Sequence, residues 1–339
     1  MDMAQEDTAR AFWVHSPGVG ALLDEPLAPL GDGDVRVRAL FSGISRGTEG
    51  RVFRGEVPSS VGQVLRCPHQ VGDFPAPVKY GYMSVGRVEA GRGDEAEALV
   101  GRTVFCLHPH QDRYVVSAGS VIPLPDGVPA ERAVLAANLE TAVNGVWDSG
   151  ACVGDRVAVV GAGVVGLLSA WLCRSHAGSE VVAVDPEASR GEPAAALGVR
   201  WLADPPPDFD ADVVIHASGS EAGLRSALEL AGVEARVIEL SWFGAHPVGV
   251  PLGEAFHPRR LTLRSSQVGR IPPERAPRWT HRRRLELALR LLRDPATAAL
   301  INAESAFEDL PATMAALAGP GDRETLCHRV TYRTKAAGG

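Results

Sequence analysis

A glycine-rich turn followed at a fixed distance by an acid is the feature of this sequence best suited to chemistry. Residues 161–166 read Gly-Ala-Gly-Val-Val-Gly, a GxGxxG pattern. An apolar run at 157–160 precedes the turn and an apolar helix follows it, as a dinucleotide-binding turn requires. The first glycine permits the tight turn, the second lets the backbone approach a pyrophosphate, and the third lets the helix pack on the strand. The residues predicted to contact the phosphates are Gly161, Gly163, Val164, Val165 and Gly166.

The next predicted strand ends in an acid, Asp185, which stands 19 residues after Gly166. A carboxylate at this place binds both ribose hydroxyls of NAD and repels the 2′-phosphate of NADP. Arg190 lies about one helical turn further on and is expected to soften that preference. We therefore predict NAD as the cofactor, with NADP as an alternative, and we include Ser218 among the cofactor-binding residues.

Strands and helices alternate around these residues. From residue 155 the apolar pattern predicts strands at 157–160, 181–184, 212–216, 236–240 and 261–265. The helices predicted between them cover 164–174, 186–196 and 221–230. Strands that alternate with helices form right-handed βαβ units, so we predict an α/β Rossmann domain with a doubly wound parallel sheet over residues 147–275.

The first part of the chain has a different pattern. Short strands are predicted at 35–40, 82–90, 103–107 and 113–116, and a helical pattern covers 129–146. A proline-rich stretch at 272–277 marks the next boundary. Beyond it we predict helices at 283–292 and 310–317 and a last strand at 327–332. Residues 1–146, completed by residues 276–339, are therefore predicted to form a second, β-rich domain.

Composition excludes several classes of function. With 339 residues, 45 % apolar and 22 % charged, the chain is expected to form two packed domains. A net charge of −7 gives nucleic acid no overall attraction, and no stretch has the length and apolar character of a membrane span. The acidic N-terminus and five scattered cysteines without a CxxC pattern predict a cytoplasmic protein with reduced thiols. Eleven arginines against two glutamates over 259–293 are either a solvated face or an anion site.

Four segments together resemble the medium-chain dehydrogenase/reductase superfamily, which includes the zinc alcohol dehydrogenases. They are residues 43–49 (Gly-Ile-Ser-Arg-Gly-Thr-Glu), 81–88 (Gly-Tyr-Met-Ser-Val-Gly-Arg-Val), 122–127 (Ile-Pro-Leu-Pro-Asp-Gly), and the GxGxxG turn with Asp185. The resemblance covers nearly the whole chain and implies that residues 1–146 are a catalytic GroES-like β-barrel domain. It also implies an NAD(P)-dependent oxidoreductase that acts on a small molecule as a homodimer. The strand at 261–265 is predicted to be the outer strand of the Rossmann sheet, and its open edge is where we expect two copies to pair.

The chain departs from that superfamily at the positions that bind zinc. Zinc members carry a cysteine where this chain has Ser45 (or Arg46), and Gly-His-Glu where it has Gly81-Tyr82-Met83. The four-cysteine lobe that binds a structural zinc is missing. Catalytic zinc needs three protein ligands, and a hydroxyl and a phenol replace thiolate and imidazole poorly. We therefore expect no zinc, with a rebuilt site from His108, His110 and Glu140 as the alternative.

Residues 42–49 and 81–86 resemble most closely the zinc-free bacteriochlorophyllide dehydrogenase type, which implies oxidation of a secondary alcohol to a ketone without metal. Hydrogen-bond donors and a proton relay must then stabilise the substrate oxygen. By position in the superfamily, Thr48 matches the relay hydroxyl and Tyr82 points into the vacated metal cavity. Glu49 and Glu140 are carboxylates near the cleft, and Asn144 matches a position that faces the nicotinamide.

Each of these assignments has a structural alternative. In these alternatives, Thr48 is a hydroxyl bonded within a local turn, and Tyr82 is a buried ring that fills space. The two carboxylates are ion-pair partners of Arg46 or another arginine. His108 and His110 are more often structural hydrogen-bonding groups than bases. Two further functions also stay open: a quinone or enoyl reductase of the same superfamily, and a catalytically silent NAD(P)-binding sensor or scaffold.

Overall fold

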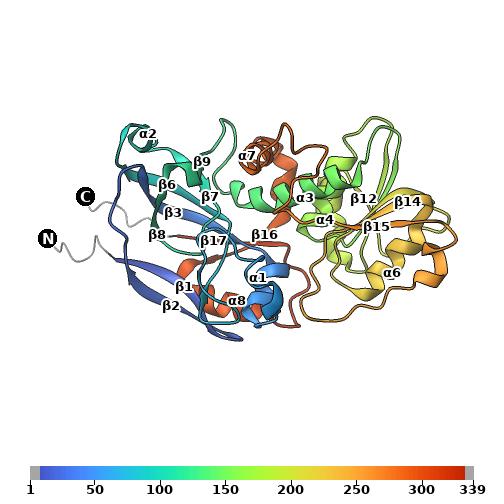
Figure 1. Ribbon diagram of the computed structural model, residues 1–339, viewed down its shortest axis with the longest axis horizontal. Helices are drawn as coiled ribbons and strands as arrows, with labels where there is room; N and C mark the ends of the chain where they lie inside the picture. The colour runs from blue at the N-terminus through green and yellow to red at the C-terminus, as the bar shows by residue number, and fades with distance from the viewer. Residues whose placement is uncertain (1–7, 333–339) are drawn as a thin grey trace. The chain divides into compact units, whose positions relative to one another are not determined.

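The computed structural model describes residues 8–332, which form two compact units (Figure 1). The first unit comprises residues up to 137 together with those from 301 onward, and the second comprises residues 138–300. The functional roles expected for the two parts, catalytic for the first and cofactor-binding for the second, remain predictions.

The second unit contains a six-stranded sheet whose strands are all parallel, in the order β12-β11-β10-β13-β14-β15. Numbered from β10, this is the order 3-2-1-4-5-6 of a dinucleotide-binding Rossmann sheet. The predicted doubly wound α/β fold is therefore confirmed. The strands are β10 (Arg156–Val160), β11 (Glu180–Val184), β12 (Arg200–Leu202), β13 (Ala211–His216), β14 (Ala231–Glu239) and β15 (Thr262–Ser265).

Burial on both faces explains why the central strands are continuous apolar runs. Val157, Ala158 and Val159 of β10 are all fully buried, as are most residues of β13. The helices of this unit are α3 (Ala136–Ser149), which begins in the first unit, α4 (Val164–Cys173), α5 (Gly191–Ala196), α6 (Glu221–Leu230) and α7 (His281–Leu291). Ser220 caps α6 by accepting a hydrogen bond from the Gly223 nitrogen at 3.0 Å.

The first unit is built on two mixed or antiparallel sheets. One has the order β16-β17-β3-β6-β7-β9, with β8 also paired to β3, and the other has the order β2-β1-β5-β4. Along β3 the apolar side chains of Val35, Val37 and Ala39 are buried while the intervening arginines are not, which is the alternation predicted for a half-buried strand. The strands are β1 (Thr8–Ser16), β2 (Val19–Pro26), β3 (Asp34–Ile44), β4 (Val71–Gly72), β5 (Val78–Lys79), β6 (Ser84–Gly91), β7 (Thr103–Cys106), β8 (Arg113–Ser117), β9 (Val121–Pro123), β16 (Ile301–Ala306) and β17 (Cys327–Thr331).

Two helices accompany these sheets, α1 (Arg46–Phe53) and α8 (Leu310–Ala318), together with the short α2 (Asp94–Glu97). Helix α1 carries Thr48 and Glu49, so Thr48 lies in a helix rather than in an isolated turn. Among the described helices, none combines the length and apolar composition that a membrane crossing needs.

The structure corrects several predicted elements. The helix predicted at 186–196 begins later, with a helical turn at Ala188–Arg190 that leads directly into α5, because Glu187 has an extended backbone. The β1–β2 hairpin and the short strand β12 were not predicted. Residues 276–300, placed with the N-terminal domain by the proline-rich stretch, lie in the second unit, where α7 is bonded to α3 through Arg284.

Strand β15 ends the sheet of the second unit within the described residues, and its side chains are mostly exposed. An open strand edge pairs readily with another strand, and pairing about a twofold axis makes the contact self-complementary. We therefore expect two copies to pair through β15. Light scattering at micromolar concentration should give twice the 35.8 kDa chain mass, and a monomer mass would contradict the prediction.

Candidate active site

The glycine turn between β10 and α4 forms an open cradle. A Cβ on Gly161 would lie 2.5 Å from the Ser218 backbone nitrogen, and one on Gly166 would lie 1.9 Å from the Gly161 carbonyl oxygen. Neither position accepts a side chain, and Gly161 also has a φ of +101°. A Cβ on Gly163 would meet no atom within 4 Å. The second glycine thus faces free space at the start of α4, and the residues fit a dinucleotide pyrophosphate.

Asp185 lies directly beside this turn. Its Oδ2 accepts a hydrogen bond from the Ala162 nitrogen at 2.8 Å, and its Oδ1 accepts one from the Glu187 nitrogen at 2.9 Å. These bonds fix the carboxylate next to the phosphate cradle, in the arrangement expected of a ribose-binding acid. Arg190 is buried in the turn before α5.

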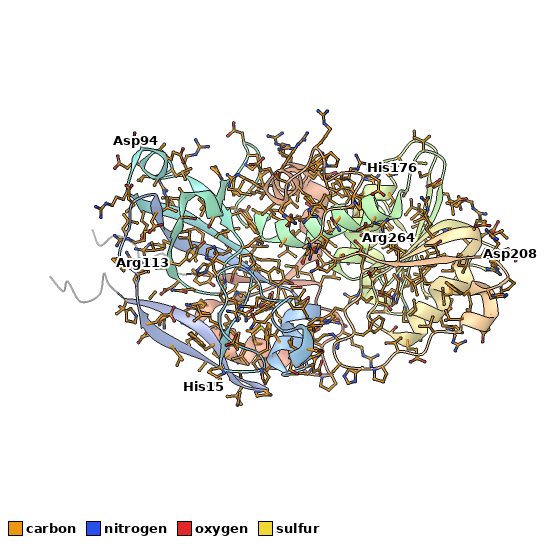
Figure 2. All side chains as sticks on the ribbon, viewed as in Figure 1. His15, Asp94, Arg113, His176, Asp208 and Arg264 are labelled. Carbon is orange, nitrogen blue, oxygen red and sulfur yellow. The ribbon has the colours of Figure 1, made fainter. Side chains whose placement is uncertain are left out.

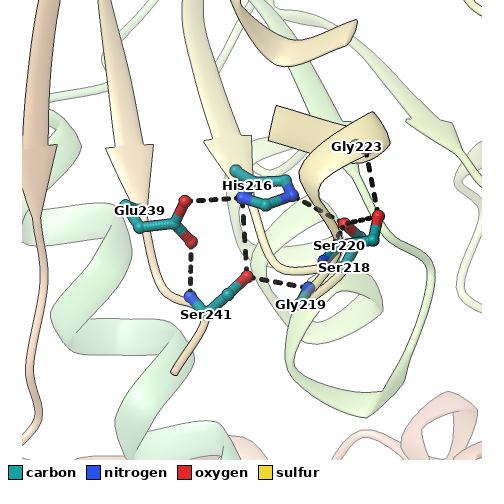
Figure 3. Close-up of polar contacts among 7 residues, drawn as sticks. All are labelled: His216, Ser218, Gly219, Ser220, Gly223, Glu239 and Ser241. Carbon is teal, nitrogen blue, oxygen red and sulfur yellow. Dashed lines mark hydrogen bonds and ion pairs between the residues drawn. The ribbon is translucent and has the colours of Figure 1, made fainter. Parts of the chain in front are cut away.

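Ser218 follows β13 and belongs to a polar cluster that the sequence did not reveal (Figure 3). Its hydroxyl lies 2.6 Å from the Nε2 of His216, whose Nδ1 lies 2.7 Å from a carboxylate oxygen of Glu239. His216 and Glu239 are the last residues of neighbouring parallel strands. That shared position at two strand ends is the signal that would have found them.

In the first unit, the side chains of Ser45 and Thr48 lie beside the phenol of Tyr82, close enough to stabilise its ionised form. Ser45 immediately precedes α1, Thr48 lies in its first turn, and Tyr82 lies just before β6. Burial, and next the charge of Glu49, raise the pKa of Tyr82 well above its usual range, so the phenol stays protonated. Thr48 and Tyr82, predicted to act together, are thus brought together.

A chain of buried polar groups adjoins this cluster. Glu49 accepts a hydrogen bond from the Ser45 nitrogen at 2.8 Å, and its other oxygen lies 2.8 Å from the Nε2 of His110. The Nδ1 of His110 lies 2.7 Å from the Ser42 hydroxyl, which lies 3.0 Å from the hydroxyl of Tyr332. Glu49 and His110 are 3 % and 1 % exposed. Ser42 and Tyr332 were not predicted, because strands β3 and β17 bring them together from opposite ends of the chain.

These residues do not fit a catalytic zinc. The ligand positions of zinc members hold Ser45, Tyr82 and the fully buried Met83, and the nearby Glu49 carboxylate is bonded to His110 and a backbone nitrogen. Within residues 8–332, no group of three or more His, Cys, Asp or Glu side chains is arranged to hold a metal ion. In particular, His108 is bonded to the Pro109 carbonyl and stacks on Tyr114 at 3.8 Å.

The remaining predicted residues lie in a buried network of the second unit. Arg284, 1 % exposed, donates from Nε to Glu140 at 3.0 Å and also bonds the amide oxygen of Asn144. The Asn144 amide nitrogen donates to Asp148 at 3.0 Å and to Ser266 at 3.1 Å. Burial raises the pKa of Glu140, and the charge of Arg284 opposes that shift. The alternative of a carboxylate paired with an arginine is therefore observed, with Arg284 rather than Arg46 as the partner.

The arginine-rich stretch is partly used by the protein itself. Besides Arg284, Arg264 pairs with Asp148 at 2.7 Å, and Arg283 lies over the ring of Trp279 at 4.1 Å. Arg264, labelled in Figure 2, belongs to the exposed strand β15. All five cysteines are free of disulfide bonds, as predicted.

Comparisons with known proteins agree with this fold. No protein-family model matches the chain. The chain is 26 % identical over 301 residues to D-guloside 3-dehydrogenase of Escherichia coli K12, covering 82 % of this chain and 86 % of that protein. A protein of Sinorhizobium meliloti 1021, described as a zinc-binding dehydrogenase and bound to NADP, superimposes with a TM-score of 0.75 at 19 % identity over 96 % and 99 % of the two chains. An alcohol dehydrogenase (rspB) of E. coli CFT073 complexed with NADH gives 0.75 at 17 % identity, with the same coverage.

The chain is an NAD(P)-dependent oxidoreductase with the GroES-like and Rossmann fold of medium-chain dehydrogenases. The resemblance found in the sequence is thus confirmed at the level of alcohol dehydrogenase-like proteins. The zinc-free branch within them stays a prediction.

Burial of His108 generates a prediction about pH. Desolvation lowers the pKa of His108 to about 3, whereas a histidine in an unfolded chain titrates near 6.5. Between these values the unfolded chain binds more protons, so stability falls as pH falls below about 6.5. At pH 5 this histidine alone should lower the unfolding free energy by about 2 kcal/mol relative to pH 7.5.

Urea titrations at the two pH values test this with His108→Phe, which keeps a ring against Tyr114 but cannot be protonated. The variant should lose about 2 kcal/mol less than the wild type on acidification, and the exposed control His15→Gln should behave as the wild type. Equal losses in all three proteins would show that His108 is not the group responsible.

Proposed function

We propose that this protein interconverts a secondary alcohol and a ketone by hydride transfer, without zinc. The observation that carries the proposal is the cluster of three hydroxyl side chains, Ser45, Thr48 and Tyr82. Ser45 and Tyr82 stand where zinc members place metal ligands, and Thr48 stands at the position of the relay hydroxyl. Zinc otherwise polarises the substrate oxygen. A group of oriented hydroxyls supplies hydrogen bonds to the same oxygen, and such donors act strongly where water is excluded.

Oxidation of an alcohol removes a hydride and a proton together. Bound NAD would accept the hydride, and the protein must hold the oxygen and take the proton. Tyr82 is suited to the first task because its raised pKa keeps the phenol protonated and able to donate. Thr48, which lies beside the same phenol, is suited to pass the proton between the substrate oxygen and its neighbours.

The proton needs an acceptor, and the pair of Glu49 and His110 is the candidate in this unit. Glu49 lies close enough to Tyr82 for its charge to affect the phenol, and it bonds His110 directly. A carboxylate in contact with an imidazole offers two basic groups to one proton, and its uptake raises the total charge of the pair by one unit. Glu140, in contrast, has its own cationic partner in Arg284, so we assign it a supporting role rather than a direct part in the chemistry.

Similarity to a protein named D-guloside 3-dehydrogenase supports a polyhydroxylated substrate with a secondary hydroxyl. Resemblance of the two metal-site segments to the bacteriochlorophyllide dehydrogenase type supports metal-free chemistry. We also propose that the protein is a cytoplasmic homodimer and that its substrate is a small molecule.

Removing the donor hydroxyls tests the proposal. Tyr82→Phe keeps the ring and deletes only the phenol oxygen, and Thr48→Val keeps the shape and deletes only the relay hydroxyl. Loss of one such donor typically lowers turnover on the order of 100-fold. We expect both variants to lower kcat to that extent in NAD-linked oxidation of a panel of polyols and sugars, while NADH binding, followed by fluorescence, changes by less than about threefold.

Met83→Leu serves as a matched control, since Met83 is buried beside Tyr82 in the chain but offers no donor. It should retain turnover within a few-fold of the wild type. Near wild-type turnover by both hydroxyl variants would show that Tyr82 only fills space and that another group holds the substrate oxygen.

Cofactor preference generates a second test. Asp185 stands beside the phosphate cradle and disfavours a 2′-phosphate, so we propose that NAD binds better than NADP. Asp185→Ser removes that charge and should narrow or invert the ratio of the two dissociation constants. A wild-type protein that prefers NADP by about tenfold or more, a difference of about 1.4 kcal/mol, would make Arg190 the dominant residue instead.

A further inference from the structure

His110 contacts a different buried polar group of the first unit with each of its ring nitrogens. Its Nε2 lies 2.8 Å from a carboxylate oxygen of Glu49, and its Nδ1 lies 2.7 Å from the Ser42 hydroxyl. The Ser42 hydroxyl lies in turn 3.0 Å from the hydroxyl of Tyr332. All four side chains are buried. Buried polar groups satisfy one another, so the hydrogens of these groups have to be matched to the contacts between them.

The carboxylate of Glu49 sets the direction of these hydrogen bonds. An ionised carboxylate only accepts, so the Nε2 of His110 must carry a proton and donate to Glu49. A neutral imidazole has no hydrogen on its other nitrogen, so Nδ1 accepts from the Ser42 hydroxyl. Ser42 has then used its single hydrogen, and the Tyr332 hydroxyl donates to it. Three hydrogens, one from each donor, thus serve the three contacts.

The opposite arrangement leaves a buried hydrogen without an acceptor. A proton on Nδ1 would point to the Ser42 oxygen, and Ser42 would then have to donate to Tyr332. Among residues 8–332, the structure gives the Tyr332 hydroxyl no acceptor other than Ser42. The backbone nitrogen of Gln111, which lies beside the phenol oxygen, can only donate to it. An unsatisfied buried hydroxyl hydrogen is costly, so the contacts favour a proton on Nε2.

The Nε2 edge of the His110 ring faces the segment that carries Tyr82. A Cβ on Gly81, the preceding residue, would lie 3.0 Å from the Cδ2 of His110, the ring carbon next to Nε2. Gly81 has a φ of +136°, so a glycine permits both this backbone and the close approach of the ring. Nδ1 lies on the opposite edge of the ring, where Ser42 covers it. The lone pair of His110 is therefore turned away from the segment of Tyr82.

We propose that Ser42, assisted by Tyr332, is a positioning residue for the transfer of the substrate proton. The two hydroxyls hold His110 as the neutral tautomer with its proton on Nε2. Nδ1 is occupied, so the proton that leaves the substrate oxygen goes to a lone pair of Glu49, which becomes a neutral acid, while the hydride goes to NAD. The inference rests on the proposed function and deepens it, because it selects Glu49 rather than His110 as the acceptor.

A neighbouring pair of residues supplies a matched control. Ser84 pairs with Ser42 between β6 and β3, and its hydroxyl lies 2.9 Å from the hydroxyl of Tyr114. This contact is also buried, but it involves no imidazole nitrogen. The ring of Tyr114 stacks on His108 without bonding it through the hydroxyl. The pair thus repeats the serine and the tyrosine without a link to a carboxylate.

Nitrogen NMR of protein that carries isotope-labelled histidine reads the tautomer directly, because protonated and unprotonated ring nitrogens differ widely in chemical shift. The signals of His110 are those missing from the spectrum of His110→Gln. At about pH 7.5 the wild type should show a protonated Nε2 and an unprotonated Nδ1 in this ring. Ser42→Ala should place part of the proton on Nδ1, whereas Ser84→Ala should keep the wild-type signals. A wild-type protein with a proton on Nδ1, alone or together with one on Nε2, would overturn the inference.

Kinetics test the consequence for proton transfer. When Nε2 is unprotonated, Glu49 must hold the shared proton and cannot accept another. Ser42→Ala should therefore lower kcat about tenfold in NAD-linked oxidation of polyols and sugars, with KM changed by less than about twofold. Tyr332→Phe should lower kcat less, by about fourfold, because Ser42 can still donate to Nδ1. Ser84→Ala and Tyr114→Phe should stay within about twofold of the wild type.

Thermal unfolding shows whether each variant is folded, and the wild-type spectrum together with Tyr332→Phe decides the test if Ser42→Ala is not. Wild-type kcat in Ser42→Ala and Tyr332→Phe would overturn the inference alone. A wild type that oxidises no alcohol with NAD would overturn the proposed function and the role in proton transfer with it. The NMR measurement needs no turnover, so it keeps these two failures apart.

Discussion

The buried carboxylate of Glu49, in the first turn of α1, imposes the constraint on which the rest of the first unit's site depends. A buried charge is stable only when hydrogen bonds and an opposite or polarisable partner replace water. Here the Ser45 nitrogen satisfies one oxygen and His110 satisfies the other. His110 in turn requires Ser42, and Ser42 is bonded to Tyr332. One buried acid therefore ties together α1, β3, β17 and the segment before β8.

The same constraint bears on the proposal of metal-free chemistry. A carboxylate that is already satisfied by a backbone nitrogen and an imidazole has little to offer a metal ion. Its charge disfavours ionisation of Tyr82, so the phenol remains the neutral donor that the proposed mechanism needs. In the second unit, Asp185 is comparable to Glu49, because it accepts hydrogen bonds from two backbone nitrogens and so fixes the shape of the cofactor turn.

The sequence predicted those features that depend on local pattern. Glycine spacing, apolar runs and the acid after the second strand predicted the Rossmann sheet and its cofactor turn, and the order of the strands confirms that fold. The sequence also indicated Thr48 and Tyr82, which the structure brings together. Partners contributed by distant segments were not predictable: Arg284 reaches Glu140 across 144 positions, and Tyr332 reaches Ser42 across 290. Nothing in the local pattern of Arg284, one of eleven arginines in a charged stretch, distinguishes it from its exposed neighbours.

Metal content is the most direct test of the account. Protein purified after growth with added zinc should be analysed by mass spectrometry of the elements, and its activity measured before and after treatment with a strong chelator. Hydroxyl-based catalysis predicts fewer than about 0.1 zinc atoms per chain and unchanged turnover, because Ser45, Tyr82 and Met83 cannot form a three-ligand site. One zinc atom per chain, with activity lost on its removal and restored on its return, would contradict it.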